Sequence, residues 1–491
     1  MVEGGNGDIG RESGSLVEKS TEINQKKEQE ENEEIEKEKP TIKAMSTKLK
    51  VLLAGLCISR YFYYTAYSMI APFFPDEAIR HGVSDTVIGF IFSSYAATCV
   101  ILSPLSGRLV PKLGARFAYL FGMFGAGLTT LSYGFLDKVA PDEYELFTAL
   151  AFIIRIAEAS FCIISINASM AIIFHQYPVH MQGFVLGITM MFFGAGLTSG
   201  PLIGGILYDV GGYELPFYVI GACIMLTVPL NYFVVDKEID ALKEQGSIVE
   251  LFKTAPGIVI PSIARMNTGI VNSFVLPILS LYLTSTYAIQ SKTLEGFIFS
   301  ILTFGYGVGS PVWGWLGDKP RLLRWSILAG LILVTVSVFF MGPCPWFHIP
   351  PYLWLLCVTL FLTGFGTAVG VIIMVDLMEK AKSSGMEDNL ALGAMVSGVY
   401  YCVYFIGTAI GPILGGVFYE LYGFAWTTTA AGFISILTCL LYGGFMVRET
   451  HLARKRQEYS DLEKNGVQLS EFPANNEKIP LSQSYPQYTQ N

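Results

Sequence analysis

Charged residues are scarce in this sequence. Of its 491 residues only 15% are Asp, Glu, Lys or Arg, whereas 52% are hydrophobic. Charged residues make up about a quarter of a soluble domain, so this shortage excludes an ordinary soluble protein. The charges lie mostly at the two ends and between repeated apolar runs of roughly 20 residues, the length of a helix that crosses a bilayer. The composition therefore indicates an integral membrane protein in a lipid bilayer.

Histidine and cysteine are also few, with five and eight residues. Seven of the cysteines fall inside apolar runs, and this placement fits neither a disulfide framework nor a metal-ligand spacing. His175 and His180 have no metal or triad partners at a useful spacing. We therefore expect no metal, no cofactor and no enzyme activity. The net charge of −8 comes largely from the acidic segment 26–40 and gives no sign of a nucleic-acid partner.

The apolar runs predict an all-α, polytopic protein with twelve transmembrane helices. Each run is long enough to span the hydrocarbon core, and polar breaks separate it from the next. The predicted spans are 49–74, 85–106, 115–136, 145–174, 182–207, 215–235, 255–285, 294–316, 323–342, 352–377, 391–418 and 424–447.

These spans divide the chain into five segments. We expect a disordered acidic tail (1–48), a six-helix bundle (49–235), a polar hinge loop (236–254), a second six-helix bundle (255–447) and a second tail (448–491). Lysine and arginine favour the tails, the hinge loop and the loops on the same side by about six to one, which predicts that both termini face the cytosol.

The two bundles share a glycine and proline pattern. The spacing G-x(8)-G-x(3)-G-P-x(2)-G-G occurs in the fifth span and again in the eleventh. Its residues are Gly187, Gly196, Gly200, Pro201, Gly204 and Gly205, then Gly398, Gly407, Gly411, Pro412, Gly415 and Gly416. Glycines four residues apart let a second helix approach closely, and an embedded proline makes a hinge-like kink. The repeat predicts two parallel halves with a substrate site between them, near the bilayer midplane.

This glycine pattern resembles the fifth-span antiporter motif of the major facilitator superfamily. A second signature of that superfamily, a loop of the form G-x-x-x-D-R/K, appears twice. The first copy, with Gly107 and Lys112, has Pro111 where the aspartate belongs. The second copy keeps Gly314, Asp318 and Lys319. The resemblance implies the major facilitator fold and assigns these loops a gating role.

Within the superfamily the chain is most similar to the vesicular amine transporter family, and to its vesicular polyamine branch. The segments "YSMIAPFFPDEA" (67–78), "GYELPF" (212–217), "LSLYL" (279–283) and "VSGVYY" (396–401) carry this similarity. Monoamine-carrying members have acidic residues in spans one, seven and eleven. This chain has Tyr63, Leu276 and Tyr401 there, and the loss at Leu276 departs from the polyamine branch as well.

Ionisable residues inside apolar spans are candidates for the transport site. Arg155 and Glu158 share a helix face and can pair. Either the pair only makes insertion tolerable, or its carboxylate takes up a proton or a substrate ammonium. Asp376 corresponds to a functional acid of the family, although a charge at a helix end that reaches water is the alternative. Arg60 lies well inside its span, and Arg265 lies near the start of the seventh.

Aromatic and amide side chains accompany these charges. Tyr64 and Tyr67 lie on the same helix face as Arg60, and Tyr401 precedes the second glycine pattern. Aromatic faces attract organic cations, although tyrosines also simply pack. Asn167 and Asn272 are candidate polar contacts to a substrate, and hydrogen bonds between helices are the alternative.

Taken together, these features predict a secondary active transporter. It would exchange protons for a small organic cation, a polyamine or monoamine, from the cytosol into acidic vesicles, and would work as a monomer. Two alternatives remain open. One is a plasma-membrane transporter of an organic anion or drug on the same fold, and the other is a membrane receptor or scaffold that transports nothing.

Overall fold

A computed structural model describes residues 45–235, 248–317, 319, 322–342, 345–346, 349–386 and 390–464 of the chain. All regular structure in these residues is helical, as the apolar runs predicted. Most of the predicted amino-terminal tail, residues 236–247 of the predicted hinge loop, and the last part of the predicted carboxyl tail lie outside the described residues.

The first half consists of six long helices and one short one. They are α2 (Thr47–Met69), α3 (Phe74–Arg80), α4 (Asp85–Leu113), α5 (Ala115–Tyr133), α6 (Tyr144–Gln176), α7 (Val179–Gly211) and α8 (Glu214–Val234). A serine side chain caps two of the starts: Ser46 accepts a hydrogen bond from the Leu49 amide at 3.3 Å, and Ser84 accepts one from the Val87 amide at 3.4 Å.

The second half repeats this order with more interruptions. Its helices are α9 (Ile248–Thr254), α10 (Val259–Ser273), α11 (Leu279–Tyr287), α12 (Lys292–Gly317), α13 (Leu323–Met341), α14 (Leu353–Thr367), α15 (Gly370–Ser383) and α16 (Leu390–Lys464). The seventh and tenth spans are each divided in two. The eleventh and twelfth form one element, which turns back at Gly423, where φ is 76°.

Eight described segments are long and apolar enough to cross a membrane. One of them, Met395–Leu452, contains both arms of α16 and crosses twice. The helices α2 and α5 and the pair α10–α11 run alongside these segments and complete the set. The described part of the chain thus has the twelve crossings that the sequence predicted.

The helices differ from the predicted segments at three places. The expected loop with Gly107 and Lys112 is helical, because α4 continues to Leu113 and turns at Gly114 alone, where φ is 82°. The last part of the expected hinge loop forms α9, whose Leu251 packs into the core of the second half. The expected tail after 447 continues α16 to Lys464. In the first and third of these cases polar residues extend a helix beyond its apolar span.

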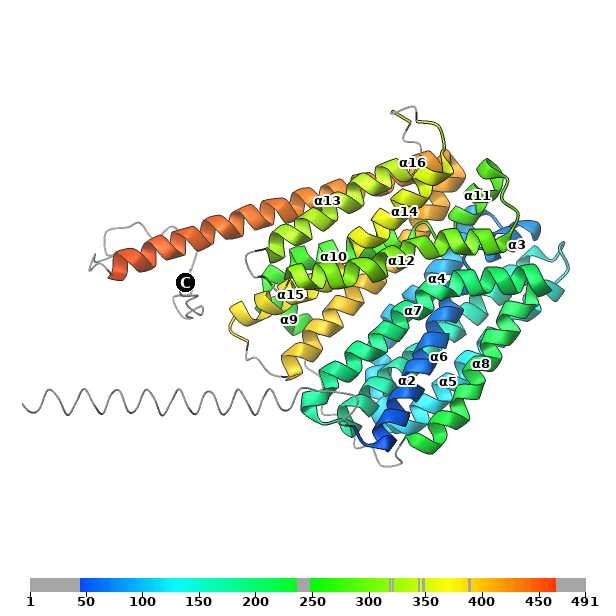
Figure 1. The fold of residues 1–491 in the computed structure, drawn as a ribbon, viewed down its shortest axis with the longest axis horizontal. Helices are drawn as coiled ribbons and strands as arrows, with labels where there is room; N and C mark the ends of the chain where they lie inside the picture. The colour runs from blue at the N-terminus through cyan, green and yellow to red at the C-terminus, as the bar shows by residue number, and fades with distance from the viewer. Residues whose placement is uncertain are drawn as a thin grey trace, which may run out of the picture.

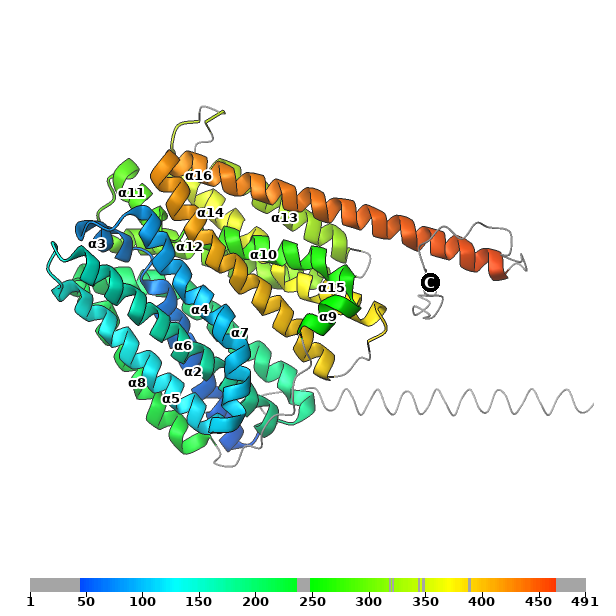
Figure 2. The ribbon, with the colours of Figure 1, turned by 180° about the vertical axis from the view of Figure 1, so that it is seen from behind.

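The two sets of helices meet at one end of the molecule and diverge toward the other (Figures 1 and 2). The diverging end carries the start of α2 and the end of α16, and we call it the terminal side. The end at which the halves meet carries α3, α11 and the start of α12, and we call it the far side.

The glycine pattern builds two kinds of helix contact. Three glycines of α7 lie against backbone carbonyls of α2, and three of α16 lie against carbonyls of α10 and of Phe274, the residue that follows it, so closely that a Cβ would collide. These are Gly196, Gly200 and Gly204, then Gly407, Gly411 and Gly415. The remaining glycines cross between the halves: Gly205 lies against the Lys292 carbonyl of α12, and Gly416 lies against the Asp85 carbonyl of α4.

Four members of the pattern differ. A Cβ at Gly187 would meet nothing within 4 Å, and Gly398 is a half-buried helical position. Pro201 and Pro412 lie inside helices, and each turns its carbonyl toward a glycine of the opposite half, Gly296 and Gly89 respectively. Close approach of backbones therefore accounts for most of the pattern.

Candidate proton and substrate site

Arg155 and Glu158 form a buried ion pair on α6. Arg155 Nη1 donates to Glu158 Oε2 at 2.7 Å, and the arginine is only 1% exposed. The guanidinium also lies over two tyrosine rings, with its central carbon 5.2 Å from the centroid of Tyr67 and 4.6 Å from that of Tyr95. The predicted pairing is therefore present, and aromatic faces from α2 and α4 support it.

The surroundings of Glu158 are mostly apolar. It lines a small internal space of the first half, together with Ala66, Met69, Ile70, Thr130, Tyr133 and Phe217. An unpaired carboxylate in such surroundings is strongly disfavoured. Either Arg155 or a bound proton must therefore neutralise Glu158.

Arg60 and its neighbours on α2 face helices α6 and α7. Arg60 donates from Nη2 to Ser169 Oγ at 3.4 Å and from Nη1 to Met190 Sδ at 3.7 Å. Tyr64 contacts the edge of Phe193, with the ring centroids 4.2 Å apart. The predicted aromatic face thus lies in the interior of the first half.

Tyr401 links the two halves. Its hydroxyl donates to Met190 Sδ at 3.7 Å, the same sulfur that Arg60 contacts. Next to it, the guanidinium of Arg265 lies over the rings of Tyr400 and Tyr404, with its central carbon 4.1 Å from each centroid. The sequence reasoning missed these two tyrosines, although their spacing of four residues places both on one helix face.

Asp376 lies within the second half. It is fully buried and accepts a hydrogen bond from the Tyr442 hydroxyl at 3.0 Å, while its other oxygen lies 3.7 Å from Arg324 Nε. These contacts come from α16 and α13, so the expected alternative of a helix end that reaches water is wrong. The structure does not bring Asp376 together with the Arg155–Glu158 pair.

The two predicted asparagines join neighbouring helices. Asn167 on α6 donates to Ser106 Oγ on α4 at 2.5 Å, and Asn272 on α10 accepts from Thr367 Oγ1 on α14 at 3.1 Å. These are the hydrogen bonds between helices that the sequence left open as the alternative to substrate contacts.

The predicted gating residues are dispersed. Lys112 is exposed at the end of α4, and Gly314 lies inside α12. Lys319 places its ammonium 3.7 Å from the centroid of Trp315. Asp318 lies outside the described residues.

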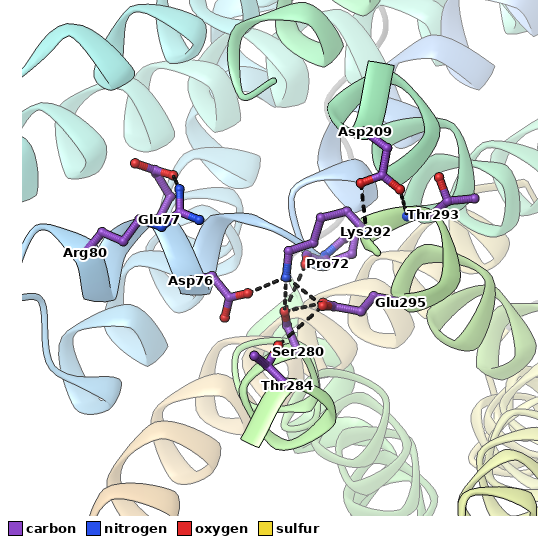
Figure 3. A network of polar contacts seen from close by, with 10 residues as sticks. All are labelled: Pro72, Asp76, Glu77, Arg80, Asp209, Ser280, Thr284, Lys292, Thr293 and Glu295. Atoms are coloured by element: carbon purple, nitrogen blue, oxygen red, sulfur yellow. Dashed lines mark hydrogen bonds and ion pairs between the residues drawn. The ribbon is translucent and has the colours of Figure 1, made fainter. Parts of the chain in front are cut away.

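A polar cluster that the sequence did not predict joins the halves on the far side (Figure 3). Lys292 of α12 pairs with Asp76 of α3 and, at 2.6 Å, with Glu295. Glu295 is fully buried, and Ser280 Oγ lies 2.5 Å from its carboxylate. The spacing of three residues between Lys292 and Glu295 was the available signal, but nothing local indicates Asp76.

Two further acids hold the halves together at helix starts. Asp209, at the end of α7, accepts hydrogen bonds from the backbone amides of Lys292 at 3.1 Å and Thr293 at 2.8 Å. Glu420 of α16 accepts one from the amide of Thr86 at 2.9 Å. Carboxylates at helix amino termini satisfy free amides and complement the helix dipole.

Comparison with known proteins identifies this architecture. The sequence model of the Major Facilitator Superfamily matches residues 56–260 and 261–478. The mouse MFS-type transporter SLC18B1 is 32% identical over 394 residues, covering 80% of this chain and 85% of the relative. The chain belongs to the major facilitator superfamily, in its vesicular amine transporter family.

Other similarities agree. The human synaptic vesicular amine transporter is 26% identical over 359 residues, which cover 71% of this chain and 65% of that protein. The crystal structure of a bacterial homologue of the human lysosomal transporter Spinster, in an inward-facing and unoccupied conformation, superposes with a TM-score of 0.68 at 13% identity. It covers 84% of this chain and 99% of that one. The chain is thus a multi-pass membrane transporter and not an enzyme.

Proposed function

We propose that this transporter exchanges protons for a small cationic amine, moved from the cytosol into an acidic vesicle. The observation that carries the proposal is the buried Arg155–Glu158 pair, whose carboxylate is neutralised either by its arginine or by a proton. The similarity to the human synaptic vesicular amine transporter supports the amine and the vesicle membrane.

The exchange follows from the competition for Glu158. When the site faces the acidic side, a proton binds the Glu158 carboxylate and neutralises it. The carboxyl group then no longer attracts the ammonium group of the amine, and the amine dissociates. When the site faces the cytosol, the proton leaves and the amine binds. Asp376 has a different role in this scheme, because it is committed to Tyr442 and Arg324 inside the second half.

The motion is a rocking of one half against the other, with the glycine and proline positions of α7 and α16 as hinges. The contacts between the halves hold the far side closed, so in this scheme the site opens toward the terminal side. The excess of lysine and arginine on the terminal side supports a cytosolic location for that opening. The vesicle interior then lies at the far side.

Substitution Glu158→Gln tests the proposal. Purified protein in liposomes with an acidic interior is offered the amine that the unmodified protein exchanges best, from a panel that includes spermidine and serotonin, while an internal dye reports proton efflux. We expect the variant to lose proton-driven exchange while it remains folded. Glu145→Gln, at an exposed position in the first turn of the same helix, is the matched control. Exchange by Glu158→Gln at the rate of the unmodified protein contradicts the proposal.

A further inference from the structure

The internal repeat places two arginines at equivalent positions. The glycines of α7 lie against the carbonyls of Tyr61, Thr65 and Met69, and those of α16 lie against the carbonyls of Met266, Ile270 and Phe274. The two sets of contacts therefore align α2 with α10. In this alignment Arg60 directly precedes Tyr61, just as Arg265 directly precedes Met266. The first and second halves thus contribute one guanidinium each, from corresponding helices.

Neither of these arginines has an acidic partner in the part of the chain that the structure describes. Arg60 and Arg265 are 5% and 3% exposed, and no carboxylate of the described residues lies within 4.0 Å of either. Among the described residues, Arg60 donates hydrogen bonds to the Ser169 hydroxyl and the Met190 sulfur. Arg265 has one hydrogen bond, to Thr268 Oγ1 at 3.1 Å, and among the described residues its Nε has no hydrogen-bond partner.

The backbone around Arg265 leaves room for its guanidinium. A Cβ at Gly370 would overlap Nη1 of Arg265, and the central carbon of the guanidinium lies over the rings of Tyr400 and Tyr404, 4.1 Å from each centroid. Ring faces hold a planar cation but leave the N–H groups at its edge free to donate. The arrangement keeps this edge available to an acceptor.

Tyr401 connects the two arginines. Its hydroxyl contacts the Met190 sulfur that Arg60 also contacts, and its ring lies 5.2 Å from that of Tyr400, which covers Arg265. Tyr401 is 37% exposed, and it lies where α16 of one half faces α7 of the other. The two guanidiniums therefore approach the boundary between the halves from opposite sides.

The other buried charges do not compensate this positive charge. Arg155 is paired with Glu158, and Asp376 is paired with Arg324. A buried charge without a counter-charge is costly in a membrane, and guanidinium groups bind carboxylate and phosphate oxygens in a fork geometry. We propose that Arg60 and Arg265 bind an oxyanion of the substrate, so that the transported amine also carries a carboxylate or phosphate. This inference rests on the proposed function, because it specifies the substrate of that exchange.

Proton-coupled exchange with four probes tests the inference. Liposomes with an acidic interior and an internal pH dye receive spermidine and serotonin, which carry only amines, glutamate, which adds carboxylates, or phosphoethanolamine, which adds a phosphate. We expect glutamate or phosphoethanolamine to be exchanged, and the better of the two identifies the oxyanion. Arg60→Gln and Arg265→Gln should each raise the KM of that probe by about tenfold or more, the loss of one charged hydrogen bond.

Arg116→Gln is the matched control, since Arg116 also covers a tyrosine ring, that of Tyr232 at 4.7 Å, but lies on α5 outside the proposed site. It should leave the KM unchanged. The inference is overturned if only spermidine or serotonin is exchanged and the KM for that amine is the same in Arg60→Gln and Arg265→Gln as in the unmodified protein. That result leaves the proposed function standing.

Binding gives a second measurement that does not depend on transport. The better oxyanion probe should raise the thermal unfolding midpoint of the purified protein, and Arg265→Lys should reduce this rise, because lysine keeps the charge but loses the fork. If none of the four probes causes proton efflux from the liposomes, the proposed function fails. The rise in the thermal unfolding midpoint alone then decides the inference. Absence of any shift with both oxyanion probes overturns it.

Discussion

Asp209 and Glu420 occupy equivalent positions, 211 residues apart at the ends of the two glycine patterns, and each caps a helix of the opposite half. Asp209 accepts from the start of α12, and Glu420 accepts from the start of α4. The internal repeat thus forms two related contacts across the boundary, both on the far side. Any motion that opens the far side must break both.

We expect the double substitution Asp209→Asn and Glu420→Gln to loosen this contact. A neutral amide accepts the helix amides more weakly than a carboxylate does, and the loss is about 1 kcal/mol at each helix start. The backbone amides of Thr86 and Thr293 should then exchange with deuterium several-fold faster. Glu214→Gln, in a surface pair with Lys138, is the control. If the deuterium exchange of the Thr86 and Thr293 amides is unchanged, Asp209 and Glu420 do not hold the far side closed.

Gly200→Ala should destabilise the first half. The added Cβ would collide with Ser68 Oγ and the Thr65 carbonyl of α2, and such overpacking costs about 1–3 kcal/mol. Gly187→Ala, on the same helix with nothing within 4 Å, should be neutral or stabilising by up to about 1 kcal/mol. Thermal unfolding midpoints of the two variants in detergent measure the difference. Equal midpoints contradict the assignment of Gly200 as a packing position.

Asp376→Asn should destabilise the second half by about 1–3 kcal/mol, because it weakens the buried hydrogen bond with Tyr442 and removes the counter-charge of the partly exposed Arg324. Tyr442→Phe removes only the hydrogen bond to the carboxylate and should cost about 1–2 kcal/mol. Thermal unfolding checks both values. Because we assign the proton to Glu158, folded Tyr442→Phe should retain the pH dependence of exchange. A shifted pH profile in that variant indicates that Asp376 titrates during transport.

Lys292→Met should destabilise the far-side cluster, because it leaves the fully buried Glu295 unpaired. Removing one partner of a buried pair costs about 3–5 kcal/mol, whereas replacing both partners by apolar residues costs much less. Adding Glu295→Leu should therefore restore much of the stability. Thermal unfolding midpoints of Lys292→Met and of the double variant show whether the second substitution restores stability. A double variant less stable than Lys292→Met excludes a simple ion-pair role.

The sequence by itself determined the class of the protein, the twelve crossings and the repeat. These features depend on local properties: the length of an apolar run, the charges that interrupt it and the recurrence of a glycine spacing. The same reasoning found the Arg155–Glu158 pair, because residues three apart on a helix are neighbours whatever the rest of the chain does. The helix ends were predicted less well, since polar residues continue α4 and α16 beyond their apolar spans.

Tertiary structure decided which charges meet. Asp376 lies beside Tyr442 and Arg324 and not beside Glu158. Lys292 reaches Asp76 across 216 residues of chain. Such contacts depend on how helices rotate and pair, which no local spacing determines. The alignment of Arg60 with Arg265 also became visible only when the glycines of α7 and α16 were seen against α2 and α10, because the packing of backbones sets that register.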